Sequence, residues 1–290
     1  MSDEKQKDYF ITRYSLIPDK QLDIETAIGI SKEMKFMDWI MSFEHEKSKE
    51  TTYYGINYTL YCKRVSEYCF FMSFAKEVHE IIGEKTDDGI KDVPIKNYKK
   101  CNIIIQTLNQ WMLIERNSDI SNTIEDQKNR IATIISRFLK PKHLYFDLGI
   151  MTEKNNFWEY VASNQGSITD IDITFSSPNF LRGIHTVNEL LHETNDIYNN
   201  TSMSIHLKNE DGRLNIDNEN TFLQDAIRYS SAGCGKWKIK SNTAKVYSSV
   251  DNPFIVQLPE NISQLKASDR QAINSTLNHV LHIDSESRKE

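Results

Sequence analysis

The stretch that decides the fold is TYYGINYTLYCKRVSEYCFFMSFAK, residues 52–76. It contains two runs of aromatic and β-branched residues separated by the polar segment Arg64–Glu67, and this arrangement predicts a β-hairpin with a polar tip. Aromatic side chains at this density suit a sheet with a buried face. We therefore expect an antiparallel sheet in the N-terminal half of the chain.

The flanking segments extend this pattern. Residues 8–17 (DYFITRYSLI) predict a strand, and residues 22–43 have apolar residues at helical spacing. Residues 101–117 predict a second hairpin with strands buried on both faces, and the Lys- and Asp-rich segment 83–100 before it is predicted to be a loop. Residues 118–140 form the clearest helix, which Pro141 ends.

The second half alternates between strands and helices. We expect strands over 143–150, 167–177, 202–210 and 236–241, with a short return strand in 211–217. Helices are expected over 155–164, 183–200 and 220–233, and at the C-terminus over 262–282. The mixture predicts an α+β fold with largely antiparallel sheets, with hairpins in the N-terminal half and alternating strands and helices in the C-terminal half. The predicted domains are 1–139, 140–262 and a C-terminal helix and tail, 263–290.

Composition favours a globular protein of the cytoplasm. The 290 residues are 39% hydrophobic and 26% charged, as in ordinary soluble domains. The four cysteines form no Cys-x-x-Cys pair, which is typical of reduced thiols. The charged start of the chain lacks a signal-peptide pattern, and the apolar runs are shorter than a membrane span.

Two windows are basic although the net charge is −6. Ala226–Val250 contains five basic residues and no acidic one, and Val93–Ile114 contains three lysines and no acid. Local potential governs phosphate contact, so an acidic protein can still bind DNA through such windows. Lysines on strand edges also keep proteins soluble, and this alternative stays open. The predicted phosphate-contacting residues are Lys96, Lys99, Lys100, Lys236, Lys238 and Lys240.

The Gly-Cys-Gly-Lys stretch at 233–236 suggests a phosphate-binding loop, but its spacing and order are wrong for one. A nucleophilic Cys234 would require a base, and no histidine lies near it in sequence. We favour a turn in which Gly233 ends a helix in the left-handed conformation and Gly235 opens a strand. The strand would then place Lys236, Lys238 and Lys240 on one face.

One alternative is a metal site. His185, Glu189 and His192 follow the spacing i, i+4 and i+7 and would share a helix face. The His-Glu-x-x-His pattern of metalloproteases is absent, and two leucines lie between Glu189 and His192. No other catalytic constellation or cofactor motif stands out in the sequence, and we predict no cofactor.

The order of elements resembles a family of phage-exclusion proteins, the A proteins of Rex pairs, and more loosely the large cytosolic partner of the Kiwa defence system. The resemblance rests on DYFITRYS with Arg13, on the hairpins of residues 53–74 and 102–117, and on Asp119 with the helix to Leu139. It continues through residues 157–180 and 204–212. The chain after Arg213 departs from the family's pattern.

The resemblance implies a non-enzymatic cytosolic protein that binds DNA with little sequence preference and self-associates as a homodimer. It also implies a membrane-protein partner encoded nearby. The predicted function is therefore a DNA-binding component of an anti-phage system. Two alternatives remain: a metal-dependent nuclease or nucleotide-hydrolysing effector toxin that uses the histidine site, and a protein-binding adaptor.

Overall fold

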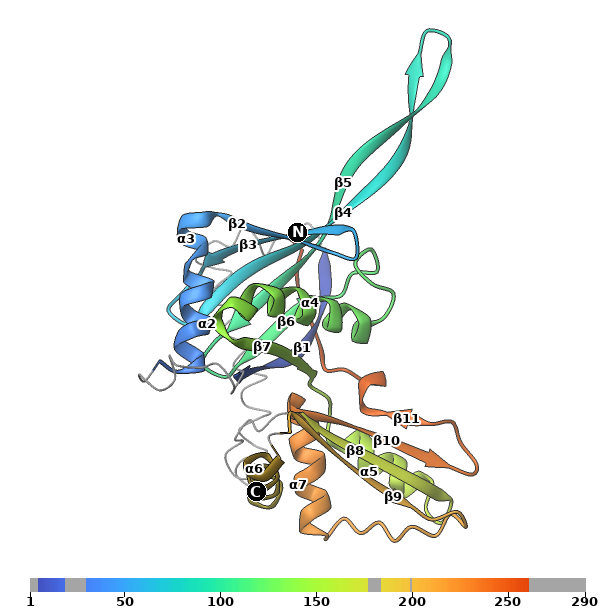
Figure 1. Cartoon of the computed structure of the whole chain (residues 1–290). Coiled ribbons are helices and arrows are strands. Elements are labelled where there is room, and N and C mark those ends of the chain that lie inside the picture. The colour runs from blue at the N-terminus through green and yellow to red at the C-terminus, as the bar shows by residue number, and fades with distance from the viewer. Residues whose placement is uncertain (1–4, 19–29, 177–183, 199, 261–290) are drawn as a thin grey trace. The chain divides into compact units, whose positions relative to one another are not determined.

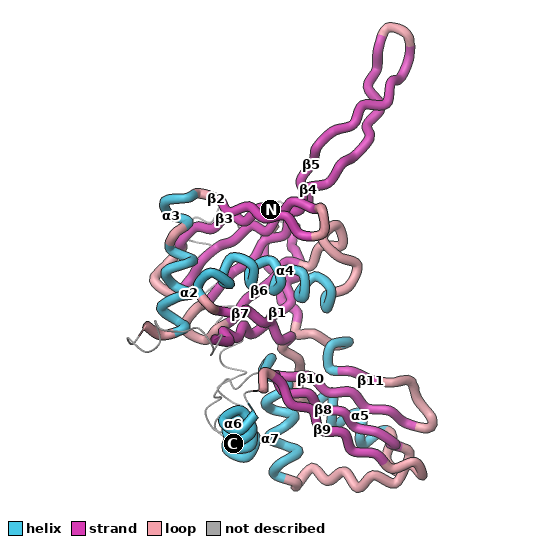
Figure 2. Tube along the Cα trace, in the orientation of Figure 1, coloured by secondary structure: helices cyan, strands magenta, loops and turns pink. Residues whose placement is uncertain are grey.

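The computed structural model describes residues 5–18, 30–176, 184–198 and 200–260. It has an α+β fold with largely antiparallel sheets, which confirms the predicted fold class (Figures 1 and 2). The chain forms two compact units. The arm unit comprises the described residues of Pro18–Leu108 and Leu113–Asp147, and the face unit those of Met1–Ile17, Asn109–Met112 and Leu148–Glu290. Compact units need not fold separately, so the predicted domain boundaries stay a prediction.

The arm unit contains the aromatic-rich stretch of residues 52–76. Its strands lie in the order β6-β5-β4-β3-β2. The predicted hairpin is β3–β4, with Cys62 opposite Met72. A tight turn at Tyr54–Gly55, both with positive φ, adds a strand that the sequence did not suggest. The bounds are β2 Ser48–Tyr53, β3 Ile56–Arg64, β4 Cys69–Thr86, β5 Gly89–Gln106 and β6 Trp111–Glu115.

The helices of this unit begin at side-chain caps. The Ser31 hydroxyl accepts from the Met34 N–H at the start of α2 (Lys32–Met41), and Thr123 does the same for Asp126 in α4 (Ile124–Leu139). The short α3 spans Phe43–Glu46. The first part of the predicted 22–43 helix lies outside the described residues. The buried aromatic and aliphatic side chains include Phe36, Trp39, Leu60, Phe74, Ile131 and Ile135.

The predicted loop over 83–100 is wrong. Strands β4 and β5 run through it, paired from Cys69–Gln106 to Thr86–Gly89, and a two-residue turn at Asp87–Asp88 joins them. Figures 1 and 2 show this ribbon extending beyond the rest of the sheet of the arm unit. Both faces of the ribbon meet solvent, so its strands need no apolar run, and the pattern that marks a buried strand is missing from the sequence.

In the face unit, the predicted N-terminal strand is β1 (Gln6–Pro18), which pairs antiparallel with β12 (Ile255–Pro259). Its residues from Tyr9 to Leu16 are buried, and these include Arg13, whose Nε donates to the Ala232 carbonyl at 2.9 Å. Strand β7 (Leu144–Ile150), whose first residues to Asp147 belong to the arm unit, confirms the prediction for 143–150. The backbone of Met151 then bonds to Ile11 at 2.9 Å.

The face unit also contains a four-stranded antiparallel sheet in the order β11-β10-β8-β9. Its strands are β8 Ile168–Ser176, β9 Ser202–Lys208, β10 Gly235–Ser241 and β11 Tyr247–Ser248, and its helices are α5 Asn155–Ser163, α6 His185–Tyr198 and α7 Thr221–Tyr229. One face of the sheet packs with the helices into a core that includes Phe157, Val187, Ile227 and Trp237. The predicted return strand in 211–217 is wrong, because within that described segment only Arg213 forms a bridge. The predicted C-terminal helix lies outside the described residues.

The Gly-Cys-Gly stretch is the turn that the sequence suggested. Gly233 has φ +78° and Gly235 is extended, while Cys234 is fully buried. Gly233 also packs directly on Gly149, where an added Cβ would lie 1.8 Å from the Gly233 carbonyl oxygen. Close backbone approach, rather than phosphate binding, accounts for glycine here.

Candidate nucleic-acid interface

The exposed face of the four-stranded sheet gathers the lysines of the second basic window. Alternation along β10 buries Trp237 and Ile239, which are 1% and 0% exposed, in the helix-covered core. Lys236, Lys238 and Lys240 therefore project from the opposite face, as the sequence predicts. We call this surface, formed by the outward residues of β8, β9 and β10, the lysine face.

Three rows of side chains cross the lysine face because the strands are in antiparallel register. From β10 through β8 to β9, the rows are Lys240–Asp170–Lys208, Lys238–Asp172–His206 and Lys236–Thr174–Ser204. Four lysines thus stand against two aspartates, but Lys208 Nζ also lies 2.8 Å from Glu210 Oε1 just beyond β9, so the positive excess lies on β10. The chain as a whole has a net charge of −6. The third row holds hydroxyls in place of acids, with Thr174 Oγ1 3.0 Å from Ser204 Oγ.

The two acids of the lysine face are held by basic neighbours. His206 Nε2 lies 3.0 Å from Asp170 Oδ1, and His206 Nδ1 lies 3.7 Å from Asp172 Oδ1. The Lys240 ammonium is 3.9 Å from Asp170 Oδ1. The hydrogen bond from His206, with further help from Thr169 and Lys240, lowers the pKa of the Asp170 carboxyl below its usual range. Asp170 therefore stays ionised and fixes the positions of the basic groups around it.

The chemistry of the lysine face fits the phosphate backbone better than the bases. Lysine is a compact point charge that neutralises phosphate without reading sequence. The outward positions of β8, β9 and β10 carry lysine, acid, hydroxyl and imidazole groups, and none within these described strands is Phe, Tyr or Trp. Stacking on unpaired bases uses aromatic or planar groups, and the one ring on this face is His206, whose nitrogens face Asp170 and Asp172.

The first basic window is placed differently. Lys96 and Lys99 lie on β5, where Lys96 Nζ is 2.7 Å from Glu77 Oε2 and Lys99 Nζ is 2.8 Å from Glu80 Oε1, both on β4. Hydrogen bonds from these lysines lower the pKa values of both glutamates. The window lacks acids in sequence, but the paired strand supplies them.

The three lysines of this window also fail to share a face. Lys96 and Lys100 lie on one side of the ribbon and Lys99 on the other, because side chains alternate along β5. Lys100 stands opposite Ala75, and its carbonyl accepts from Asn117 Nδ2 at 2.8 Å. The structure therefore places Lys236, Lys238 and Lys240 on one face of a strand, as predicted. It separates the other three predicted lysines between the two faces of the ribbon.

The histidine site suggested by the sequence is not assembled in the described part of the chain. His192 Nδ1 lies 2.9 Å from Asp196 Oδ2, one turn further along α6, and Glu189 is exposed. The side chain of His185 lies outside the description. Among the described residues, no group of three His, Cys, Asp or Glu side chains is placed to hold a metal ion.

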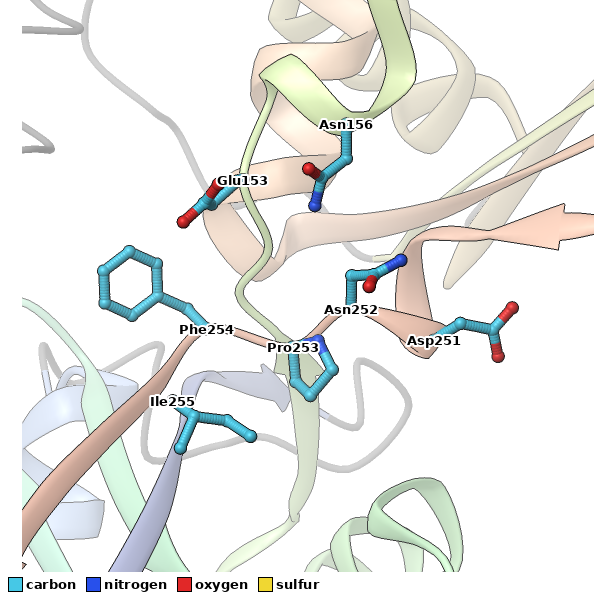
Figure 3. Close-up of a pocket in the computed structure, with 7 residues that line it drawn as sticks. All are labelled: Glu153, Asn156, Asp251, Asn252, Pro253, Phe254 and Ile255. Atoms are coloured by element: carbon cyan, nitrogen blue, oxygen red, sulfur yellow. The ribbon is translucent and has the colours of Figure 1, made fainter. Parts of the chain in front are cut away.

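A shallow pocket in the face unit offers a second place for a ligand (Figure 3). It has a volume of about 400 Å³ and carries two carboxylates, so it is unsuited to phosphate. Two of its side chains already support local structure: Asp251 Oδ2 accepts from the Ser248 N–H at 3.2 Å, and Asn252 Nδ2 donates to Tyr247 Oη at 2.6 Å. The lining residues are Glu153, Asn156, Asp251, Asn252, Pro253, Phe254 and Ile255.

Sequence reasoning missed His206, Lys208, Asp170 and Asp172 as members of one site. The signal was present in part, because residues 167–177 and 202–210 were both predicted as strands. Which side chains share a row depends on strand order and register, and these follow from pairings distant in sequence.

No protein-family model matches the chain, and no curated protein is significantly similar to it. Within the described residues, no helix combines the length and apolar character needed to cross a membrane.

Proposed function

We propose that the chain binds DNA through phosphate contacts at the lysine face, without sequence preference and without catalysis. The observation that carries the proposal is the shared orientation of Lys236, Lys238 and Lys240 on one exposed strand face. Alternate residues of a strand are about 6.8 Å apart, so the three lysines form a row of positive charge about 14 Å long.

The acids of the lysine face limit the affinity of this binding and affect its salt dependence. Asp170 and Asp172 lie in the middle strand, so each approaching phosphate meets attraction from β10 and some repulsion from β8. Exposed charges of both signs are screened by salt within about 10 Å at 0.1 M. We expect moderate affinity that falls steeply as salt is added.

The biological setting follows from the resemblance to phage-exclusion proteins. In this proposal the chain is a cytoplasmic DNA-binding component of an anti-phage system. It would act as a homodimer and signal to a membrane-protein partner encoded nearby.

The test is a salt titration of binding to a random-sequence duplex, followed by fluorescence anisotropy. The variant Lys236→Ala/Lys238→Ala/Lys240→Ala should reduce the slope of log K against log salt by roughly three times 0.9, or about 2.7. Lys47→Ala/Lys63→Ala/Lys140→Ala removes three exposed lysines from elsewhere and serves as the matched control.

The proposal predicts an unchanged slope for the control and equal affinity for duplexes of different sequence. An equal loss of slope in both variants would mean that net charge alone drives the binding. An unchanged slope in the β10 variant would remove the lysine face from the account. Wild-type protein that shows no binding even at low salt would refute DNA binding itself.

A further inference from the structure

The turn between β2 and β3 holds an exposed aromatic residue in a strained backbone conformation. Tyr54 and Gly55 are the two residues of this turn, with φ +47° and +73°. Two-residue hairpin turns with positive φ at both positions favour Asn-Gly or Asp-Gly, and a bulky residue in the left-handed region is uncommon. Tyr54 is also 87% exposed, so burial of its ring does not offset this strain. A strained position that packing does not explain is typical of a functional residue.

The tyrosine before this turn contacts both Tyr54 and an arginine. The ring centroids of Tyr53 and Tyr54 are 4.4 Å apart, at an interplanar angle of 52°. The Arg137 guanidinium carbon lies 5.5 Å from the centroid of the Tyr53 ring, and Arg137 Nε donates to Thr51 Oγ1 at 3.3 Å. A cation over an aromatic face is attracted by the ring, which fixes Arg137 beside the two tyrosines.

Arg130 adds a second positive charge near the same ring. It lies about two turns before Arg137 on α4, and its Nη1 donates to Tyr58 Oη at 2.7 Å. Desolvation and the neighbouring Tyr54 raise the pKa of Tyr53 while Arg137 and Arg130 lower it, so both cations lie near the Tyr53 hydroxyl. Within the described residues, neither arginine forms an ion pair with an acid. We call Tyr53, Tyr54, Arg130 and Arg137 the tyrosine–arginine site.

We propose that the tyrosine–arginine site binds an unpaired nucleotide of a single-stranded nucleic acid. The base presents a flat ring on which Tyr54 can stack, and the phosphate supplies the counter-charge for the two arginines. In a duplex the bases are stacked on one another, so their faces are closed to a side chain. The site belongs to the arm unit and the lysine face to the face unit, and this proposal does not rest on DNA binding at the lysine face.

The chemistry of the site favours this ligand over three others. A neutral sugar would stack on a tyrosine but would leave both arginines without a counter-charge. A phosphotyrosine side chain combines a ring with a charge, but anchoring rings fill pockets and Tyr54 stands exposed at a turn. Arg130 and Arg137 are about 10.5 Å apart along the helix axis, so a strand with successive phosphates is favoured over a free nucleotide.

The test compares fluorescein-labelled decathymidylate with an abasic strand that has the same number of phosphates, by fluorescence anisotropy. Both are measured on full-length Lys236→Ala/Lys238→Ala/Lys240→Ala protein, the parent variant, which lacks the phosphate contacts proposed for the lysine face. We expect decathymidylate to bind at least about fivefold more tightly than the abasic strand, because stacking on even one base contributes that much. Failure of this preference and failure of duplex binding at the lysine face are thus separate results.

Tyr54→Asn, made in the parent variant, separates binding from folding. Asparagine is preferred at this turn position, so the protein should melt at a higher temperature while its preference for decathymidylate falls to about one. Tyr54→Phe keeps the ring and should retain the preference. Tyr61→Ala is the matched control and should retain it too, because Tyr61 is 51% exposed but lies on the opposite face of β3 from Tyr58.

Arg137→Ala should weaken both strands and reduce the slope of log K against log salt by about 0.7, as expected for one phosphate contact on a single strand. Equal binding of the two strands by the parent variant, or a preference that survives Tyr54→Asn, would overturn the proposal. Thymidine monophosphate or a phosphotyrosine peptide that displaces the labelled strand better than unlabelled decathymidylate does would overturn it in favour of that ligand.

Discussion

His206 Nε2 lies 3.0 Å from Asp170 Oδ1, across the register between β9 and β8. The contact couples the edge strand to the middle of the lysine face, where Lys240 approaches the same carboxylate oxygen from β10. Asp170 is therefore the point at which three strands meet through their side chains. It orders basic groups on an otherwise solvent-exposed surface.

Removal of His206 should change the titration of Asp170. The folded pKa of Asp170 is lowered, so this group stabilises the fold above its unfolded pKa of about 3.9, and that contribution is lost as the pH falls through the folded value. In His206→Ala the pKa of Asp170 should rise toward its ordinary value, and the unfolding free energy should depend less on pH in the acid range. Carboxyl ¹³C NMR of Asp170 measures the first effect. An unaltered Asp170 titration would show that the histidine contact does not form in solution.

The contact between Gly149 and Gly233 should tolerate no side chain. In Gly149→Ala the new Cβ would lie 1.8 Å from the Gly233 carbonyl oxygen, so the backbone must separate. We expect the free energy of unfolding to fall by more than about 3 kcal/mol, as in severe overpacking. Urea denaturation followed by tryptophan fluorescence measures this loss.

The matched comparison is Gly233→Ala against Gly166→Ala. The two glycines have nearly the same φ, +78° and +77°, but the Gly233 Cβ would meet the Gly149 oxygen at 2.8 Å whereas that of Gly166 meets nothing within 4 Å. Gly166→Ala should cost only the left-handed penalty of about 1–2 kcal/mol. Equal losses in the two variants would show that conformation, and not close packing, selects glycine at 233.

Neighbouring residues on β10 should respond in opposite ways to truncation. Trp237 is buried and meets Phe157 edge-on, with ring centroids 5.2 Å apart, so Trp237→Ala should cost about 3–5 kcal/mol of unfolding free energy. Lys238→Ala removes an exposed side chain and should change it by less than about 0.5 kcal/mol. Thermal denaturation of both variants measures the two losses of stability. A Trp237→Ala protein as stable as the wild type would contradict the assigned orientation of the sheet.

The cysteines should be unreactive in the folded protein. Cys101 and Cys234 are fully buried, and burial raises the pKa of the Cys101 thiol to about 12 and that of Cys69 to about 11. The pKa of Cys62 is also raised to about 12, mainly by burial. A thiol with a pKa of about 12 is ionised in about one molecule in ten thousand at pH 8. Ellman's reagent should therefore react slowly with native protein and with all four thiols in guanidinium. Rapid reaction of one thiol in the native protein would contradict this prediction and identify a reactive cysteine.

Much of the fold could be predicted from local pattern. Aromatic and β-branched runs identified β1, β3, β4 and the buried β6, and a clear apolar stripe identified α4. The turn at Gly233 followed from glycine chemistry alone. Local rules suffice where one face of an element is buried, because burial imposes its period on the sequence.

The outer ribbon of β4 and β5 and the lysine face show where such rules stop. The outer ribbon has no buried face to impose a pattern, and the Lys- and Asp-rich composition of residues 83–100 suggested a loop where the two strands pair down to a two-residue turn. The basic windows were defined along the chain, whereas charge is balanced across strands, as Glu77 and Glu80 do for Lys96 and Lys99. Register decides which lysines face a common solvent surface, and register is a long-range property.

The most direct test of the central claim is a lysine-acetylation footprint of the wild-type protein with and without duplex DNA, read by mass spectrometry. DNA bound at the lysine face should protect Lys236, Lys238, Lys240 and Lys208 from acetylation, while Lys47, Lys63 and Lys140 stay equally reactive in both samples. Protection should disappear when salt releases the DNA. Protection confined to other lysines, or uniform reactivity in the presence of bound DNA, would contradict the account.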